Sequence, residues 1–104
     1  MTTLRIEHAV NDYATWRGAF DRGAPLRAQA GVRGYRIQRL VDDRNYLMID
    51  LDFDDTKGAE TLLTILRERV WASPENSPGL AGQPQARIVE TVEDARSAPN
   101  VTAD

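Results

Sequence analysis

Hydrophobic and polar residues alternate at every second position in four segments of the chain. These segments are Leu4–Val10, Val32–Val41, Tyr46–Phe53 and Ala86–Val92. A period of two is typical of a β-strand with one buried face. In two further segments, Tyr13–Phe20 and Ala59–Trp71, hydrophobic residues recur at helical spacing, which predicts two amphipathic helices. The predicted order is strand, helix, strand, strand, helix, strand.

Residues that start and stop helices flank the first helical segment. Asn11 and Asp12 come directly before it, and either side chain can cap its first turn. Pro25 suits the first position of a short additional helical turn, and Gly31 suits the position just after its end. We therefore expect a second, shorter helical piece before the next strand.

This order of elements predicts a ferredoxin-like α+β sandwich, in which the helices cover one face of an antiparallel sheet. With 104 residues, the chain is expected to form a single domain over residues 1–93, and 94–104 a flexible tail. Two polar connections are predicted to be loops, Asp42–Asn45 and the longer Ser73–Pro84. Long loops in compact domains are often lids or mobile connections.

The predicted sheet has two unlike faces. Alternation places an apolar set beneath the helices: Leu4, Ile6, Tyr35, Ile37, Leu47, Ile49, Leu51 and Phe53. The opposite face carries a mixed set: Arg5, Glu7, Arg36, Gln38, Tyr46, Met48, Asp50 and Asp52. Such a face is tolerable in water but better covered, and its charges of both signs can pair across a two-fold axis.

Charge and composition exclude several classes of function. The net charge of −3 argues against a polyanionic partner, and Glu7, Asp50 and Asp52 on the mixed face would repel an RNA phosphate backbone. The chain has no cysteine, which excludes disulfides and thiolate chemistry. No run approaches the ~18 apolar residues of a membrane span. Met1–Thr3 leads directly into a strand without the features of a signal peptide, so we expect a cytoplasmic protein with neither nucleic-acid nor membrane partners.

Four strings give the chain a family resemblance: Val10–Trp16, Phe20–Asp21, Gly31–Arg36 and Tyr46–Phe53. Together with the order and size of the elements, they resemble the dimeric α/β-barrel superfamily over about residues 3–93. That superfamily includes cofactor-free monooxygenases of antibiotic biosynthesis, small isomerases and haem-degrading enzymes. The chain is most similar to small uncharacterised actinobacterial proteins described as cyclase-like. The resemblance implies a homodimer whose two sheets close into a shared barrel.

The same resemblance implies a function. It points to a small cofactor-independent enzyme that acts on an aromatic or polyketide-like compound by proton transfer, cyclisation or oxygenation. The alternative is a non-catalytic homodimeric barrel that binds a small ligand or serves only as an interaction module. A cavity between helices and sheet would favour the first interpretation, and a completely filled interior the second.

His8 is the candidate catalytic residue, because it is the only histidine and the only side chain whose ordinary pKa lies near neutrality. Alternation places it on the apolar face with Ile6 and Val10. There it can act as a general base in a pocket, or it can be a hydrogen-bonded histidine at the edge of the core.

Aromatic and basic residues supply the candidate ligand contacts. Trp16, Tyr35 and Trp71 can wall a cavity beside His8, or they can be ordinary core residues. Arg27 is a candidate substrate-binding residue in a cluster with Arg33, Arg36 and Arg39. One of these arginines can clamp a carboxylate or an enolate. Otherwise they form salt bridges with nearby acidic side chains, among them Asp50, Asp52, Glu7 and Glu90.

No metal or other cofactor is expected. Glu7 and His8 point to opposite sheet faces, so they do not chelate together. The haem-degrading members of the superfamily place their axial histidine on a helix, and neither predicted helix here contains one.

Overall fold

The fold is described from a computed structural model in which residues 1–95 are placed. Four strands and three α-helices follow in the order β1 (Thr2–Val10), α1 (Tyr13–Arg22), α2 (Ala24–Ala30), β2 (Gly34–Leu40), β3 (Asp43–Phe53), α3 (Thr56–Ile65) and β4 (Leu80–Glu90). A π-helical turn, η1 (Leu66–Val70), and a 3-10 turn, η2 (Pro74–Asn76), lie between α3 and β4. The tail predicted over 94–104 lies outside the described residues except for its first two positions.

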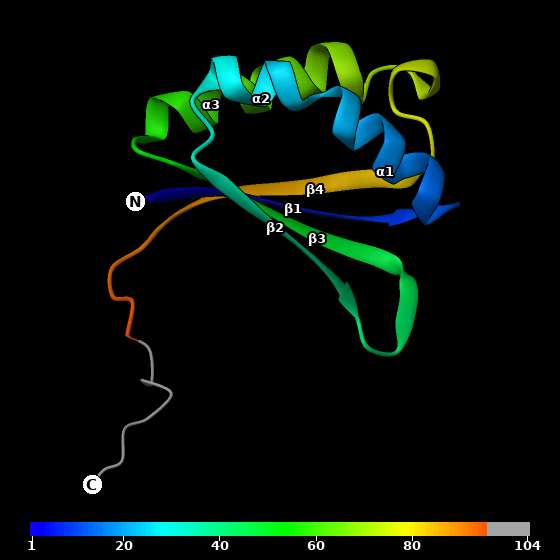
Figure 1. Ribbon diagram of the computed structural model, residues 1–104, viewed down its shortest axis with the longest axis horizontal. Helices are drawn as coiled ribbons and strands as arrows, with labels where there is room; N and C mark the ends of the chain where they lie inside the picture. The colour runs from blue at the N-terminus through cyan, green and yellow to red at the C-terminus, as the bar shows by residue number, and fades with distance from the viewer. Residues whose placement is uncertain (96–104) are drawn as a thin grey trace, which may run out of the picture.

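The strands form one antiparallel sheet in the order β2-β3-β1-β4, and all three helices lie on one of its faces (Figure 1). The other face is not covered by any element of the described chain. This confirms the predicted α+β sandwich. The additional helix expected from Pro25 and Gly31 is present as α2, and Gly31 ends it with a positive φ of 91°.

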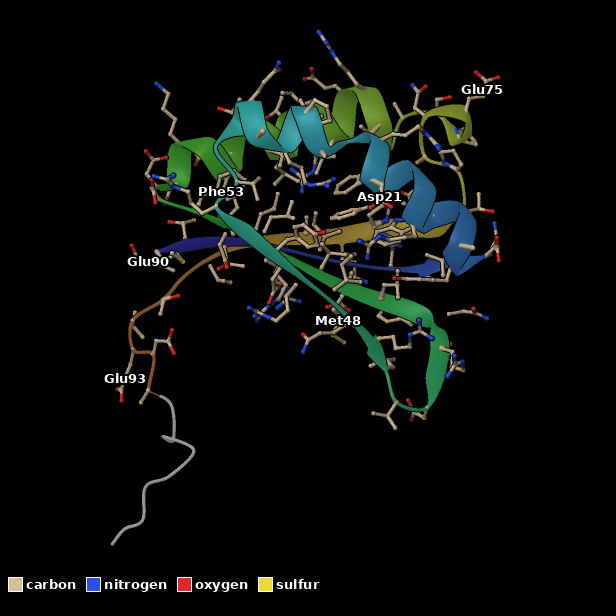
Figure 2. The ribbon with its side chains drawn as sticks, viewed as in Figure 1. Asp21, Met48, Phe53, Glu75, Glu90 and Glu93 are labelled. Carbon is tan, nitrogen blue, oxygen red and sulfur yellow. The ribbon has the colours of Figure 1, made fainter. Side chains whose placement is uncertain are left out.

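The core lies between the helices and the inner strands. Leu4 of β1, Leu47 of β3 and Leu62 of α3 are almost completely buried, and Phe53 closes one end beneath the helices (Figure 2). β2 is an edge strand, so the helices shield it less. Tyr35 is therefore 46% exposed although it belongs to the predicted apolar face.

Two predicted loops are shorter in the structure. The hairpin between β2 and β3 turns at Val41 and Asp42, because β3 already begins at Asp43, which pairs with Leu40. The predicted loop Ser73–Pro84 ends early, because β4 begins at Leu80. Pro84 lies inside β4, which is possible because β4 is an edge strand and needs no hydrogen bond on its outer side.

A bulge in β4 lies opposite His8. Glu7 of β1 pairs with Gln85, whereas Ala9 pairs with Ala81, so residues 82–84 stand opposite His8 alone. Gly82 has a φ of +72°, a conformation that glycine adopts without strain. The bulge bends β4 and allows the sequence Gly–Gln–Pro within a strand.

The last helix changes its winding before it ends. Asp55 caps α3 by accepting a hydrogen bond from the Gly58 backbone N–H (3.0 Å). After Ile65 the chain widens into the π-helical turn, where the Trp71 N–H donates to the Leu66 carbonyl, five residues earlier, at 2.7 Å. This helix was predicted over Ala59–Trp71; α3 begins three residues earlier, at Thr56, and the widened turn ends at Val70.

The uncovered sheet face carries a network of opposite charges centred on Asp50, which is only 4% exposed. Arg5 Nε donates to Asp50 Oδ1 at 2.9 Å, and Arg36 Nη2 donates to Asp50 Oδ2 at 2.8 Å. The hydroxyl of Tyr46 donates to Glu7 on the same face at 2.6 Å. These contacts match the ion-pair interpretation of Arg36 rather than its role as a ligand clamp.

Candidate functional site

A cavity of about 210 Å³ lies between the helices and the sheet. It is mostly apolar, and the residues that give it chemical character are His8, Trp16, Phe20, Arg27, Trp71 and Asn76. They come from β1, α1, α2, the end of η1 and η2, so segments distant in sequence meet there. The side chains therefore do not fill the space between helices and sheet, as they would in a protein with no internal site.

His8 forms part of the sheet side of this cavity and is 3% exposed. Its Nδ1 lies 2.9 Å from the backbone oxygen of Ala9. A carbonyl oxygen only accepts, so Nδ1 carries the proton and Nε2 has the free lone pair. Nε2 has no hydrogen-bond partner among the described residues. Burial lowers the pKa of His8 below its ordinary value of 6.5, which keeps the ring neutral at pH 7.

Aromatic rings extend from His8 along the wall made by α1. The centroids of His8 and Trp16 are 5.7 Å apart, and those of Trp16 and Phe20 are 5.1 Å apart in a stacked arrangement. Trp16 and Phe20 are one helical turn apart, so both face the sheet. The neutral imidazole thus stands at one end of an aromatic wall, which suits contact with a flat ring.

The segment after η1 covers another side of the cavity. Trp71, Asn76 and Pro78 line it, and the Asn76 side chain is held by a hydrogen bond from Nδ2 to the Arg69 carbonyl (2.8 Å). Gly79 anchors the segment to the start of α1, where the Asn11 N–H donates to its carbonyl at 2.7 Å. A Cβ at Gly79 would lie 2.6 Å from the Trp16 backbone nitrogen. This close approach requires glycine.

Arg27 lies on the α2 side of the cavity, with its guanidinium carbon 3.7 Å from the centre of the Phe20 ring. Its Nη1 donates to the Phe20 carbonyl at 2.6 Å. Burial lowers the pKa of Arg27, because the cation is partly removed from water. Arg27 is therefore the cationic group of the cavity wall.

The other arginines of the predicted cluster lie elsewhere. Arg36 pairs with Asp50, and Arg33 pairs at the surface with Asp54, which was not among the predicted acidic partners. Arg39 is exposed and lies over the Tyr13 ring.

Four of the five sequence-predicted site residues line the cavity: His8, Trp16, Arg27 and Trp71. The fifth, Tyr35, is not among the residues that line it. Its ring packs edge-on against Phe20, with centroids 5.0 Å apart. Phe20 and Asn76 were not among the predicted site residues. The helical spacing of Phe20 gave a signal, but the loop residue Asn76 gave none.

The described residues 1–95 were compared with what a metal site and a membrane span each require. These residues contain no group of three histidine, cysteine or acidic side chains positioned to hold a metal ion. None of their helices is long and apolar enough to cross a membrane.

The comparisons with known proteins gave different results for the sequence and for the fold. No family model and no curated protein matches the sequence. Solved structures do match the fold. The chain has a ferredoxin-like fold.

Three solved structures serve as examples of proteins with a similar fold. A candidate antibiotic biosynthesis monooxygenase from Bordetella bronchiseptica has a TM-score of 0.66 at 14% identity, covering 88% of this chain and 98% of that one. SnoaB, a cofactor-independent oxygenase from Streptomyces nogalater, has a TM-score of 0.60 at 18% identity, with 95% and 96% covered. A dimeric ferredoxin-like protein from an uncultured marine organism has a TM-score of 0.62 at 8% identity, with 93% and 100% covered. At these identities the likeness establishes the fold.

Proposed function

We propose that the protein is a small cofactor-independent enzyme that acts on an aromatic or polyketide-like compound. The reaction that we propose is an oxygenation. The observation that carries this proposal is a neutral, buried His8 at the end of an aromatic wall inside a cavity. The cofactor-independent oxygenase among the structures with the same fold supports the choice of reaction.

The chemistry begins with a proton transfer to Nε2 of His8. The Ala9 carbonyl accepts the Nδ1–H bond and stabilises the imidazolium that forms. Removal of a proton from an acidic C–H or O–H group beside an aromatic ring leaves an electron-rich anion. Dioxygen then acts as the oxidant: it takes one electron from the anion, and the superoxide and substrate radical combine into a peroxide with a new C–O bond. The peroxide takes the proton back from His8 and loses water together with the second hydrogen of the same carbon, so that one oxygen atom stays in the substrate as a carbonyl and the other leaves in the water. The apolar surroundings disfavour the charged form of His8 and keep the base neutral until substrate arrives.

We further propose that the protein is a homodimer formed through the uncovered sheet face. Arg5, Arg36 and Arg87 on that face are balanced by Glu7, Asp50 and Asp52, so a second copy can meet it with complementary charge. Met48 lies on the same side, away from the helices (Figure 2). Two of the similar structures are dimeric ferredoxin-like proteins, which supports this assembly.

A substitution of His8 tests the proposed reaction. His8→Asn keeps a donor that can reach the Ala9 carbonyl but removes the basic Nε2. We expect the wild type to consume dioxygen with members of a panel of hydroxylated naphthalenes, without added metal or flavin. His8→Asn should lower the rate by about 100-fold or more, as general-base removal does. The measurement is oxygen uptake at an electrode, corrected for spontaneous oxidation.

Two outcomes would contradict the proposal. An unchanged rate in His8→Asn would remove His8 from the reaction. Binding of the panel without any oxygen uptake or chemical change in the compounds would favour the alternative, a dimeric barrel that only binds a ligand. Thermal unfolding of His8→Asn serves as the control that the variant is folded.

A further inference from the structure

Arg27 is a half-buried cation with no carboxylate within salt-bridge distance in the described part of the chain. A guanidinium has five N–H donors, and the bond to the Phe20 carbonyl is the hydrogen bond that the described residues provide. Its guanidinium carbon lies over the Phe20 ring at 3.7 Å and over the Tyr35 ring at 5.4 Å. Most of its donor capacity is therefore unused by the protein.

The other arginines of the cluster show how unusual this is for the chain. Arg33 and Arg36 each pair with an aspartate, and Arg39 is exposed to water. Arg27 has neither arrangement. Asp21 raises the pKa of Arg27 from beyond salt-bridge distance, but its carboxylate is paired with Arg17, and the partial burial of the guanidinium lowers the pKa overall.

The cavity wall offers no anion to balance this charge. Among the described residues that line the cavity, none is acidic, and His8 is neutral. A ligand that fills the cavity and brings its own anionic oxygen would satisfy Arg27. Arg27 and His8 are separated by the Phe20 and Trp16 rings, so the anionic group and the reacting atom of such a ligand lie at opposite ends.

The size of the cavity limits the ring system. An apolar cavity of about 150 Å³ accommodates benzene, and sites for drug-sized ligands measure roughly 300–1,000 Å³. At about 210 Å³, this cavity suits one or two fused rings.

We infer that the cavity takes a mono- or bicyclic aromatic acid, with its ring along Trp16 and Phe20 and its carboxylate paired with Arg27. The inference rests on the proposed function, because it names the substrate class of the same cavity. A planar guanidinium receives a carboxylate through two parallel hydrogen bonds, which also fixes the orientation of the ring. The acid group would then hold the opposite end of the ring near His8.

The test compares 2-naphthoate with the neutral 2-naphthamide, which has the same shape, by isothermal titration calorimetry at pH 7. The wild type should bind the acid at least about tenfold more tightly than the amide, a difference of about 1.4 kcal/mol. Arg27→Met keeps the length of the side chain without its charge, and it should bind both compounds alike. Arg39→Met, which removes an exposed arginine that also lies over a ring, is the matched control and should keep the preference.

The results that would contradict the inference differ from those that would contradict the proposed function. Equal binding of acid and amide by the wild type, or a preference that persists in Arg27→Met, would overturn the inference and leave the proposed function standing. The wild-type comparison decides even if Arg27→Met does not fold. If neither compound binds, the inference fails, and the oxygen-uptake experiment judges the proposed function separately.

Discussion

Gly79 shows how one missing side chain positions the site. Its φ is +81°, and a Cβ there would collide with the Trp16 backbone. Gly82 has a similar φ of +72°, but a Cβ at that position would meet nothing within 4 Å. A side chain at Gly82 would therefore strain only the backbone, whereas one at Gly79 would also collide with Trp16. Gly79 lies in the connection between η2 and β4, and Gly82 lies in the bulge of β4.

We predict that Gly79→Ala destabilises the protein more than Gly82→Ala. Each variant suffers backbone strain of roughly 1–2 kcal/mol, but only Gly79→Ala must also displace the start of α1. Urea unfolding measures the difference, and the near-UV circular dichroism of the tryptophans should change in Gly79→Ala alone. Equal losses of stability in the two variants would show that a Cβ at position 79 does not have to displace Trp16.

His8 should make stability depend on pH. Burial lowers its pKa in the folded state, whereas the unfolded chain keeps a value near 6.5. Below pH 6.5 the unfolded state therefore binds more protons, and stability falls as the pH falls. His8→Asn should lose this part of the slope. The measurement is the free energy of unfolding of both proteins at pH 5 and pH 7.5, and identical slopes would contradict the shift.

At the scale of elements, the position of α1 depends on its first turn. Asp12 caps α1 by accepting a hydrogen bond from the Thr15 N–H at 3.1 Å, and this turn carries the aromatic wall toward the cavity. We predict that Asp12→Ala lowers the melting temperature by a few degrees, because two donors of Thr15 lose their acceptor. Asp12→Asn keeps an acceptor at the same place and should behave like the wild type. A drop of the same size in Asp12→Asn would assign the effect to charge instead of capping.

The elements also show what sequence patterns can and cannot predict. Strict alternation in β1 and β3 reflects burial of one face, so their residues were placed correctly, and the caps at Asp12 and Gly31 were recognisable. β4 was predicted over Ala86–Val92 but spans Leu80–Glu90, and its start was missed because Gly82 and Pro84 are turn residues in most contexts. The sheet order shows that β4 is an edge strand, and its pairing register with β1 shows the bulge. Both depend on contacts between distant segments of the chain.

The candidate site was partly predictable for the same reason. Alternation placed His8 on the helix side of the sheet, and helical spacing placed Trp16 opposite it. Arg27 could not be separated from Arg33 and Arg36 by sequence, because the difference lies in which arginine finds an aspartate in three dimensions. Trp71 directly follows the π-helical turn, for which the residue pattern carried no signal.

For the whole molecule, the uncovered sheet face gives a prediction of assembly. Light scattering at micromolar concentration should give about twice the 11.6 kDa of the chain. Met48→Lys replaces an apolar side chain of this face, directly opposite Glu7, with a cation that must lose its water on assembly, and it should shift the protein toward monomer. The fold should persist, because Met48 lies on the side away from the core.

Val92→Lys is the control for this experiment, since Val92 is 91% exposed beyond the end of β4. It makes a comparable change of an apolar side chain and should leave the mass unchanged. A wild-type protein that stays monomeric at high concentration would overturn the proposed dimer.

The bulge opposite His8 has a consequence for the length of the chain. One residue of β1 faces three residues of β4, so the excess is two, an even number. Leu80, before the bulge, and Ala86, after it, therefore face the same side of the sheet, paired with Val10 and Ile6. Loss or gain of one residue here would turn Leu80 out of the cavity and Ala81 into it. Homologous chains should therefore differ in length at this place by two residues or by none.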